Sequence, residues 1–299
     1  GRAVVGLQNI AAALAAGQAP TAQSLNAIAP FQRAGWGYFF LGSAAVMPRP
    51  DLNEELDDSQ LTGTVKLAYH PNDNTLTYAS FATGYKAGGT NTDRILPSLS
   101  PLFDAEKSRS AEIGIKHDFE EYGVRVNAAA HYTQISDFQA TTFTGTGFNL
   151  QNAGDIIVKG VELEATWLMT ENTKLHAVAS RTLANFDEFK RGTCWVAYTW
   201  HTGIDDPGRV EPNDPFCSRD GDRVGFEPQN SLSLMLNHYF EVGNYPASAS
   251  IDYQYTGDVF LDDANDPYKY ADDFSLFNVR VSFTIPQWDS EIIAWSRNV

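Results

Sequence analysis

The chain has 299 residues, of which 43% are hydrophobic and 19% are charged. This length accommodates one large or two ordinary domains, and the composition is that of a folded protein rather than of a disordered polymer. The formal net charge of −16 argues against a nucleic-acid-binding function, because such proteins need a basic surface.

No apolar run approaches the ~20 residues of a membrane helix. A membrane-spanning β-strand needs only ~9–11 residues with alternate apolar positions, so a membrane location stays open. The opening segment, residues 2–19, has features of a secretory signal peptide, but Gln8 and Asn9 interrupt its apolar part. We favour a short helix that ends near Gly17, with one face formed by Leu7, Ile10, Ala11 and Leu14.

Residues 1–60 carry no convincing strand and end in the acidic stretch 51–58, so we expect a long loop region with one short helix there. From Leu61 onward, runs of alternating polarity are separated by turn-forming residues, which is typical of β-structure. We predict an all-β, antiparallel fold for residues 61–299. It has about ten strands, at 61–70, 75–86, 106–119, 122–143, 152–169, 175–189, 226–242, 247–261, 274–285 and from 291 onward.

The clearest alternation lies between residues 106 and 169. Val124, Val126 and Ala128 point to one side, whereas Arg125, Asn127 and His131 point to the other, and Val161 and Leu163 alternate likewise with Glu162 and Glu164. The charges within the strand middles all fall opposite the apolar set: Lys66, Glu112, Arg125, Glu162, Glu164, Asp252 and Arg280. One face of the sheet is therefore dry and the other wet, although alternation alone does not decide which face is inside.

The lengths of the connections favour a membrane barrel. Tight turns fall at 71–74, 120–123, 170–174, 243–246 and 286–290, and they alternate with longer connections at 87–105, 144–151, 190–225 and 262–273. A soluble β-sandwich has no reason to collect every short turn at one end, whereas an outer-membrane barrel has short periplasmic turns and long extracellular loops.

Several segments resemble one family of outer-membrane proteins. Residues 78–91, YASFATGYKAGGTN, and residues 103–119, with the pattern F-x-x-E followed by E-x-G-x-K, are similar to segments of TonB-dependent receptors. Further similar segments follow in the same order: ISDFQ at 135–139, the span 152–164, and RVSFTI leading to IIAWSRNV. The resemblance covers about residues 61–299 and is closest to the subgroup described as siderophore receptors.

The resemblance implies a 22-stranded barrel with a plugged lumen, in the outer membrane of a Gram-negative bacterium. The plug and the TonB-contacting box would then precede Gly1, and the last strand would follow Val299. Leu61–His70 would be the twelfth strand, and residues 1–60 most of the preceding extracellular loop. The implied function is energised uptake of a scarce solute such as a ferric siderophore. The alternatives are a passive porin-like channel and a soluble β-sandwich binding module.

The implied partners are outer-membrane lipid and lipopolysaccharide, the TonB complex and a small ligand such as a metal chelate. We expect a monomer that binds no nucleic acid. Ligand contacts are expected from loop residues: Tyr85, Lys86, Asn91, Arg94, Trp195, Tyr198 and Trp200. The alternative role of each of these residues is packing in the aromatic girdle of the barrel or within a loop.

Cys194 and Cys217 are the only cysteines, and both lie in the longest loop. In an exported protein this placement favours a disulfide that holds the loop as a preformed lid, with a stabilisation of ~3 kcal/mol. A metal site that uses the two cysteines and His201 is the alternative, but no short ligand spacing supports it, and we predict no metal and no cofactor.

Two loops are rich in aspartate: Asp205, Asp206, Asp214, Asp220 and Asp222 in one, and Asp262, Asp263, Asp266, Asp272 and Asp273 in the other. Oxygen-rich loops can bind Ca²⁺, but no EF-hand spacing is present, so solvated acidic loops are favoured. Bridging of lipopolysaccharide by divalent ions is a further use of this charge. The six histidines are scattered and no nucleophile motif is present, so we expect no enzyme.

Overall fold

The computed structural model describes residues 9–10, 12–13, 53–91, 100–143, 148–195, 205–209 and 216–299. Asn9, Ile10, Ala12 and Ala13 are helical, in agreement with the short helix expected near the start. The other positions of that expected helix, including Leu7, Leu14 and Gly17, lie outside the described residues. Among the described residues, no helix is long and apolar enough to cross a membrane.

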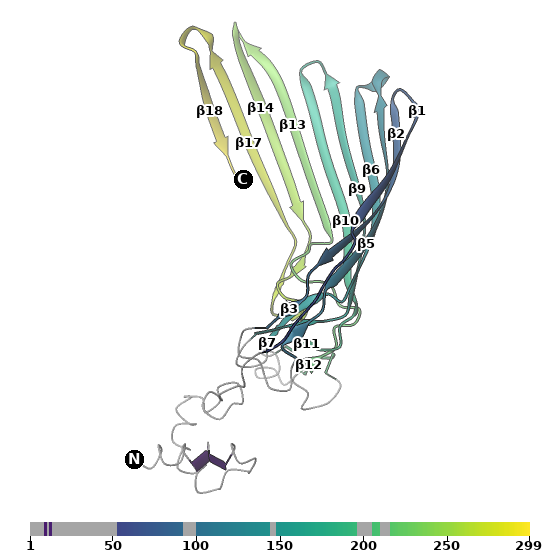
Figure 1. Ribbon diagram of the computed structural model, residues 1–299. Helices are drawn as coiled ribbons and strands as arrows, with labels where there is room; N and C mark the ends of the chain where they lie inside the picture. Colours follow the sequence, from purple (N-terminus) through teal and green to yellow (C-terminus); the bar gives the residue numbers. More distant parts are fainter. Residues whose placement is uncertain are drawn as a thin grey trace. The chain divides into compact units, whose positions relative to one another are not determined.

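One ten-stranded antiparallel sheet dominates the fold (Figure 1), and its strands pair in chain order. The prediction of an all-β antiparallel fold with about ten strands is confirmed. The sheet is open, because β1 and β18 each pair with a single neighbour. Its strands are β1 (Gly63–Asn72), β2 (Thr75–Lys86), β5 (Glu106–Phe119), β6 (Val124–Ser136), β9 (Asp155–Thr170), β10 (Thr173–Glu188), β13 (Asn230–Val242), β14 (Tyr245–Thr256), β17 (Phe274–Ile285) and β18 (Ser290–Ser296).

The tight turns that join these strands all lie at one end of the sheet, the upper end in Figure 1. Two of them are single 3-10 turns, at Glu120–Tyr122 and Pro286–Trp288, and each is closed by a residue in the left-handed region, Gly123 and Asp289. The longer connections leave the strands at the opposite end. The asymmetry that the sequence predicted is therefore present.

The structure differs from the prediction at the loop end, where four short hairpins form in segments expected to be irregular or to extend the long strands. They pair β3 (Gly89–Thr90) with β4 (Leu102–Phe103), β7 (Gln139–Phe143) with β8 (Phe148–Asn152), β11 (Gly192–Thr193) with β12 (Phe216–Cys217), and β15 (Val259–Phe260) with β16 (Tyr270–Ala271).

The clearest difference concerns the strand predicted over residues 122–143. It ends at Ser136 because Asp137 adopts a positive φ of 56°, which leaves the extended region. The backbone N–H of Asp137 then donates to the Asp155 carboxylate at 3.3 Å, and the chain continues into β7, which belongs to a different sheet. A local φ change of this kind leaves no signal in the alternation of polar and apolar residues.

Residue contacts divide the chain into two compact units. The first comprises residues 1–58, 88–104 and 139–152, and the second comprises residues 59–87, 105–138 and 153–299. The hairpins β3–β4 and β7–β8 belong to the first unit, whereas the ten-stranded sheet and the other two hairpins belong to the second.

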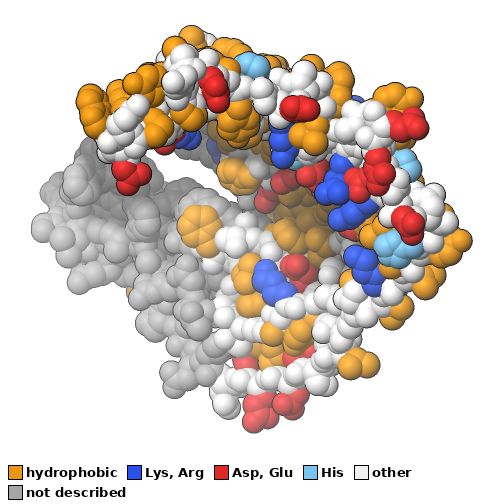
Figure 2. All heavy atoms as spheres, turned by 90° about the horizontal axis from the view of Figure 1, so that it is seen from above, with side chains coloured by type: hydrophobic (Ala, Val, Ile, Leu, Met, Phe, Trp, Pro, Cys, Tyr) orange, Lys and Arg blue, Asp and Glu red, His pale blue; other side chains and the backbone are white. Residues whose placement is uncertain are grey.

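The register of the sheet gives each face a distinct chemistry. Directly paired residues share a face, so Ile113, Ala130 and Val161 lie together on the face that we call outer. Lys116, Asn127 and Glu164 lie together on the opposite face, which we call inner. Figure 2 looks down on the tight-turn end, where hydrophobic side chains line much of the outer margin of the curved sheet and Lys and Arg side chains gather toward its hollow.

The inner face carries a polar network. Asn127 Nδ2 donates to Glu164 Oε2 at 2.9 Å, and the Arg125 guanidinium forms a two-pronged contact with Asp118 at 2.5 and 2.9 Å. The outer face instead exposes large apolar side chains without covering them: Ile113 is 64% exposed, Val161 55% and Leu163 48%. Such a face needs an apolar environment.

Gly154 supplies a test of the fold. Its φ is +131°, and a Cβ at this position would lie 1.9 Å from the Glu188 carbonyl oxygen. We expect Gly154→Ala to lower the free energy of unfolding by ~3 kcal/mol or more, because this backbone region is open only to glycine. Gly243→Ala is the matched control, since its φ of +67° is merely left-handed and no atom lies within 4 Å of the added Cβ.

For Gly243→Ala we expect the free energy of unfolding to fall by ~1 kcal/mol. The measurement is the midpoint of urea unfolding followed by tryptophan fluorescence. Equal midpoints for the two variants would show that the close approach of Gly154 to β10 is unimportant.

Candidate functional site

The candidate site is a network between two loops of the second unit. The first, which we call the disulfide loop, comprises residues 189–229 between β10 and β13, and the second, the acidic loop, comprises residues 257–273 between β14 and β17. Within the disulfide loop, residues 189–195, 205–209 and 216–229 are described.

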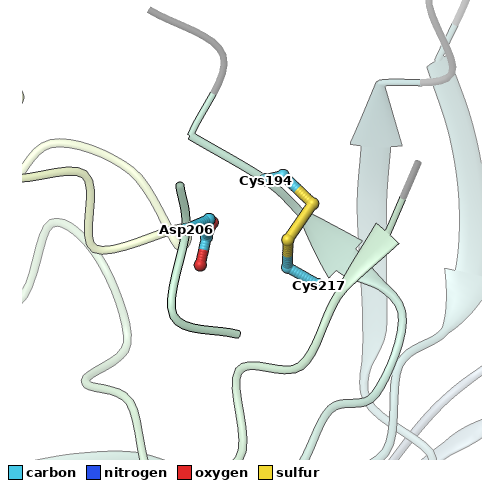
Figure 3. Close-up of side chains that lie close together, drawn as sticks. All are labelled: Cys194, Asp206 and Cys217. Carbon is cyan, nitrogen blue, oxygen red and sulfur yellow. A yellow bond between two sulfur atoms is a disulfide. The ribbon is translucent and has the colours of Figure 1, made fainter. Parts of the chain in front are cut away.

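A disulfide joins Cys194, directly after β11, to Cys217 of β12 (Figure 3), with an S–S distance of 2.03 Å and a Cα–Cα distance of 5.2 Å. Asp206 lies close to both sulfur atoms. Sulfur atoms in a disulfide are not thiolates, so these three residues do not form the ligand set of a Zn²⁺ site. His201, the further ligand considered from the sequence, lies outside the described residues.

Arg219 is the centre of the network and is only 1% exposed. Its guanidinium donates to the carboxylate of Asp206, to the Ala264 carbonyl oxygen at 2.9 Å and to Asp222 Oδ2 at 3.3 Å. Asp206 is itself buried and also accepts from the backbone N–H groups of Trp195 and Gly208 at 2.9 and 2.8 Å. The Arg219 guanidinium therefore links three segments: the β11–β12 hairpin with its disulfide, residues 205–209 and the acidic loop.

A second arginine ties the same two loops together. Arg223 donates to the Asp258 carboxylate at 2.5 Å and to the Asp258 carbonyl oxygen at 2.9 Å. The side chain of Asn265 accepts from the Arg223 N–H at 3.1 Å and donates to its carbonyl oxygen at 2.6 Å. The hydrogen bond from Arg223 lowers the pKa of Asp258 below its ordinary value, whereas burial raises the pKa of Asp222.

The aspartates of the acidic loop mainly fold the loop itself. Asp263 accepts from the Gly225 N–H at 2.9 Å, and Asp266 accepts from the Tyr268 N–H at 2.9 Å. Asp262 accepts from the Asp266 N–H at 3.2 Å and from Lys269 Nζ at 2.7 Å. The bond from Tyr268 to Asp266 is typical of an Asx turn, in which a short carboxylate caps a nearby backbone donor, whereas the bond from Gly225 to Asp263 joins the acidic loop to the disulfide loop. The Ca²⁺ hypothesis for these loops stays a hypothesis, and Asp214 lies outside the described residues.

The ligand contacts predicted from the sequence are distributed over both units. Tyr85 pairs with Lys107 and lies on the outer face of the sheet, whereas Lys86 lies on the inner face, 3.7 Å from Glu106. Asn91, in the first unit, exchanges two hydrogen bonds with the backbone of Leu150 at 2.7 and 2.8 Å.

Trp195 lies inside the loop network, where its indole N–H donates to the Ala264 carbonyl oxygen at 2.6 Å. Arg94, Tyr198 and Trp200 lie outside the described residues. Sequence reasoning missed Arg219 and Arg223, because a charged residue in a loop is normally solvated and nothing in the local pattern marks it as buried. The one available signal was the position of Arg219, two residues after Cys217.

Removal of the central cation tests the network. We expect Arg219→Ala to destabilise the two loops by ~3–5 kcal/mol, because the buried Asp206 carboxylate loses its partner. Hydrogen exchange measured by mass spectrometry should show lost protection over residues 205–209, 216–225 and 257–266. Lys190→Ala is the control in the same loop, and it should change little because its pair with Glu188 is exposed. Unchanged exchange in the Arg219 variant would refute the central role of this residue.

Comparison with known proteins identifies the family. The family model for the "TonB dependent receptor-like, beta-barrel" domain matches residues 40–298. The curated "Pesticin receptor" of Yersinia pestis is 35% identical over 129 residues, which are 42% of this chain and 18% of the relative.

Two solved structures share the fold. The ferric yersiniabactin uptake receptor FyuA from Yersinia pestis aligns with a TM-score of 0.61 at 21% identity, over 81% of this chain and 32% of that one. The siderophore receptor PiuA from Acinetobacter baumannii aligns with a TM-score of 0.51 at 17% identity, over 75% and 29% of the two chains. These relatives are receptors rather than enzymes. Because the family model covers most of the sequence, the chain belongs to the TonB-dependent receptor β-barrel family.

Proposed function

We propose that this chain forms part of the wall and outer loops of an outer-membrane receptor that takes up a scarce solute at the expense of energy delivered by TonB. The observation that carries the proposal is the division of the ten-stranded sheet into an apolar outer face and a charged inner face. Lys or Arg at the midplane of a bilayer costs ~2–4 kcal/mol when it faces lipid, so only the inner face suits a water-filled lumen.

The inner face supplies the wet side that transport needs. Lys116, Glu162 and Glu164 lie on it, and Asn127 links to Glu164 by a hydrogen bond. A polar lumen of this kind accommodates a plug and a hydrated solute, whereas an apolar lumen would hold neither. We propose that this surface contacts the plug of the complete receptor.

The loop network suits solute capture. Arg219 and Arg223 join the disulfide loop to the acidic loop, and the disulfide closes the β11–β12 hairpin. Loops held in this way lose little conformational entropy when a ligand binds, which favours high affinity. We propose that the β11–β12 hairpin, closed by the disulfide, acts as a preformed lid. Trp195 directly follows Cys194, and Tyr198 and Trp200 are among the candidate ligand contacts.

The named relatives support a proposal for the substrate class. The curated relative is a pesticin receptor, and the solved structures include a ferric yersiniabactin uptake receptor and a siderophore receptor. We propose a ferric siderophore as the solute, a Gram-negative outer membrane as the location, and a monomeric assembly with TonB as the energy-coupling partner.

The test is uptake by whole cells. A strain that lacks the receptor gene and the same strain complemented with that gene are each supplied with ⁵⁵Fe-loaded siderophores, including yersiniabactin. Both strains are tested with and without a functional tonB gene. We expect receptor-dependent iron accumulation that is lost without TonB. Uptake that persists without TonB and rises in proportion to the solute concentration would identify a passive channel instead and contradict the proposal.

A further inference from the structure

Four basic residues lie on the apolar outer face of the sheet rather than on the charged inner face. Lys107 and Arg109 on β5, Lys159 on β9 and Arg181 on β10 all share the outer face with Ile113 and Val161. All four are exposed. The other Lys and Arg residues within the ten described strands lie on the inner face, among them Lys66, Lys116, Arg125, Lys174 and Arg280. We call the four outer residues the basic cluster.

The members of the basic cluster lie near one another at the loop end of the sheet. Val161 pairs with Arg181, and Lys159 pairs with Leu183, so Lys159 and Arg181 are diagonal neighbours whose Cα atoms are ~7–8 Å apart. Lys107 and Arg109 follow each other on one side of β5, ~7 Å apart. Only β6 separates the two pairs.

The positive charges of the basic cluster are available to a bound anion. Within the described residues none of its four side chains forms an ion pair, whereas Lys86 on the inner face contacts Glu106. Two acidic residues, Asp155 and Asp187, lie further toward the loops on the same strands. Asp155 accepts hydrogen bonds from Gln134 Nε2 at 3.4 Å and from the Asp137 N–H at 3.3 Å, so it is already engaged.

The height of the basic cluster corresponds to a lipid headgroup region. Lys159 pairs directly with Tyr132, and Trp167 marks the tight-turn end of the same strand. The residues from 159 to 167 span ~26 Å along the strand at ~3.3 Å per residue, or ~20 Å of height at a tilt of ~40°. The apolar band of an outer-membrane barrel is ~25 Å tall, so Lys159 and Tyr132 lie near its edge. By register, Lys107 and Arg109 lie further toward the loops, and Arg181 lies two residues nearer the tight turns. Tyrosine is the residue typical of that level.

A groove of about 740 Å³ adjoins the basic cluster on the side of the tight turns. Most of its lining residues belong to the outer face, and its surface is almost wholly apolar. Ala128, Ala130 and Ala179 are shorter than the adjacent Ile113 and Leu163, which recesses the surface there. Arg181 also lines the groove, so the apolar recess and the basic cluster are continuous.

We propose that this face binds a phosphorylated, multiply acylated lipid of the outer leaflet, with its phosphates on the basic cluster and an acyl chain in the groove. Charge complementarity selects the occupant, because clustered Lys and Arg at the headgroup level recognise phosphate. The chemistry is that of lipid A, the membrane anchor of lipopolysaccharide. The proposal rests on the proposed membrane location, since it needs the outer face to meet lipid.

The test is a titration of the receptor, purified in detergent, with lipid A, followed by native mass spectrometry. The variant is Lys159→Ala with Arg181→Ala, and the matched control removes one Lys and one Arg from the inner face, Lys116→Ala with Arg280→Ala. We expect the outer variant to raise the dissociation constant for lipid A about 30-fold, on the order of fivefold per charge removed. The inner variant should leave it unchanged. Higher salt should reduce the difference.

Three results would overturn the proposal. They are equal affinity of the outer variant and the parent, equal binding of lipid A without its phosphates, and equal binding of phosphatidylglycerol, which would show that any anionic lipid suffices. Ala179→Phe provides a second variant without a charge change, and we expect it to weaken binding by filling the groove.

Heat-modifiable gel mobility and TonB-dependent uptake are measured on the same variants. Normal assembly and uptake together with unchanged lipid A affinity would refute the lipid site and leave the proposed function intact. Failure of the parent to enter a membrane would refute the proposed function itself.

Discussion

In the proposed membrane location the fold depends on one constraint: a strand with a period of two that lies between lipid and water must keep its charges on a single face. Lys116, Glu162 and Glu164 obey this constraint, as does the hydrogen bond between Asn127 and Glu164. The tight turns at one end and the longer loops at the other follow from the same geometry, because each strand must cross the apolar layer before the chain can reverse. Lys107, Arg109 and Lys159 depart from the rule toward the edge of that layer, where the cost of a charge falls to ~0–1 kcal/mol, and Arg181 adjoins them.

The described parts of the loops combine buried apolar side chains, such as Phe189 and Phe216, with buried polar contacts. Arg219 and Arg223 add buried or partly buried ion pairs to Asp206 and Asp258, and the disulfide restrains the hairpin that these contacts hold. The aspartates therefore have a structural role that their net charge alone does not indicate. A loop region built in this way is rigid enough to present a binding surface and polar enough to remain soluble.

Most of the sheet could be predicted from the sequence, because alternation and turn residues report directly on strands. The bounds of β2, β5 and β17 match the expected runs, and the face of each residue within β6 and within Val161–Trp167 follows from parity. The end of β6 at Ser136 could not be predicted, since it depends on the positive φ of Asp137 and its bond to Asp155. The burial of Arg219 was equally inaccessible, because it arises from contacts with Asp206 and Ala264, which are distant in sequence.

The most direct measurement concerns which face meets lipid. Val126 lies on the outer face and Asn127 on the inner face of the same strand, so arginine at each position changes the charge equally. Folding yield into lipid vesicles should fall for Val126→Arg, which places a charge on the lipid-facing side, and change little for Asn127→Arg, which remains beside Glu164. Equal yields, or a greater loss for Asn127→Arg, would contradict the assignment of the two faces.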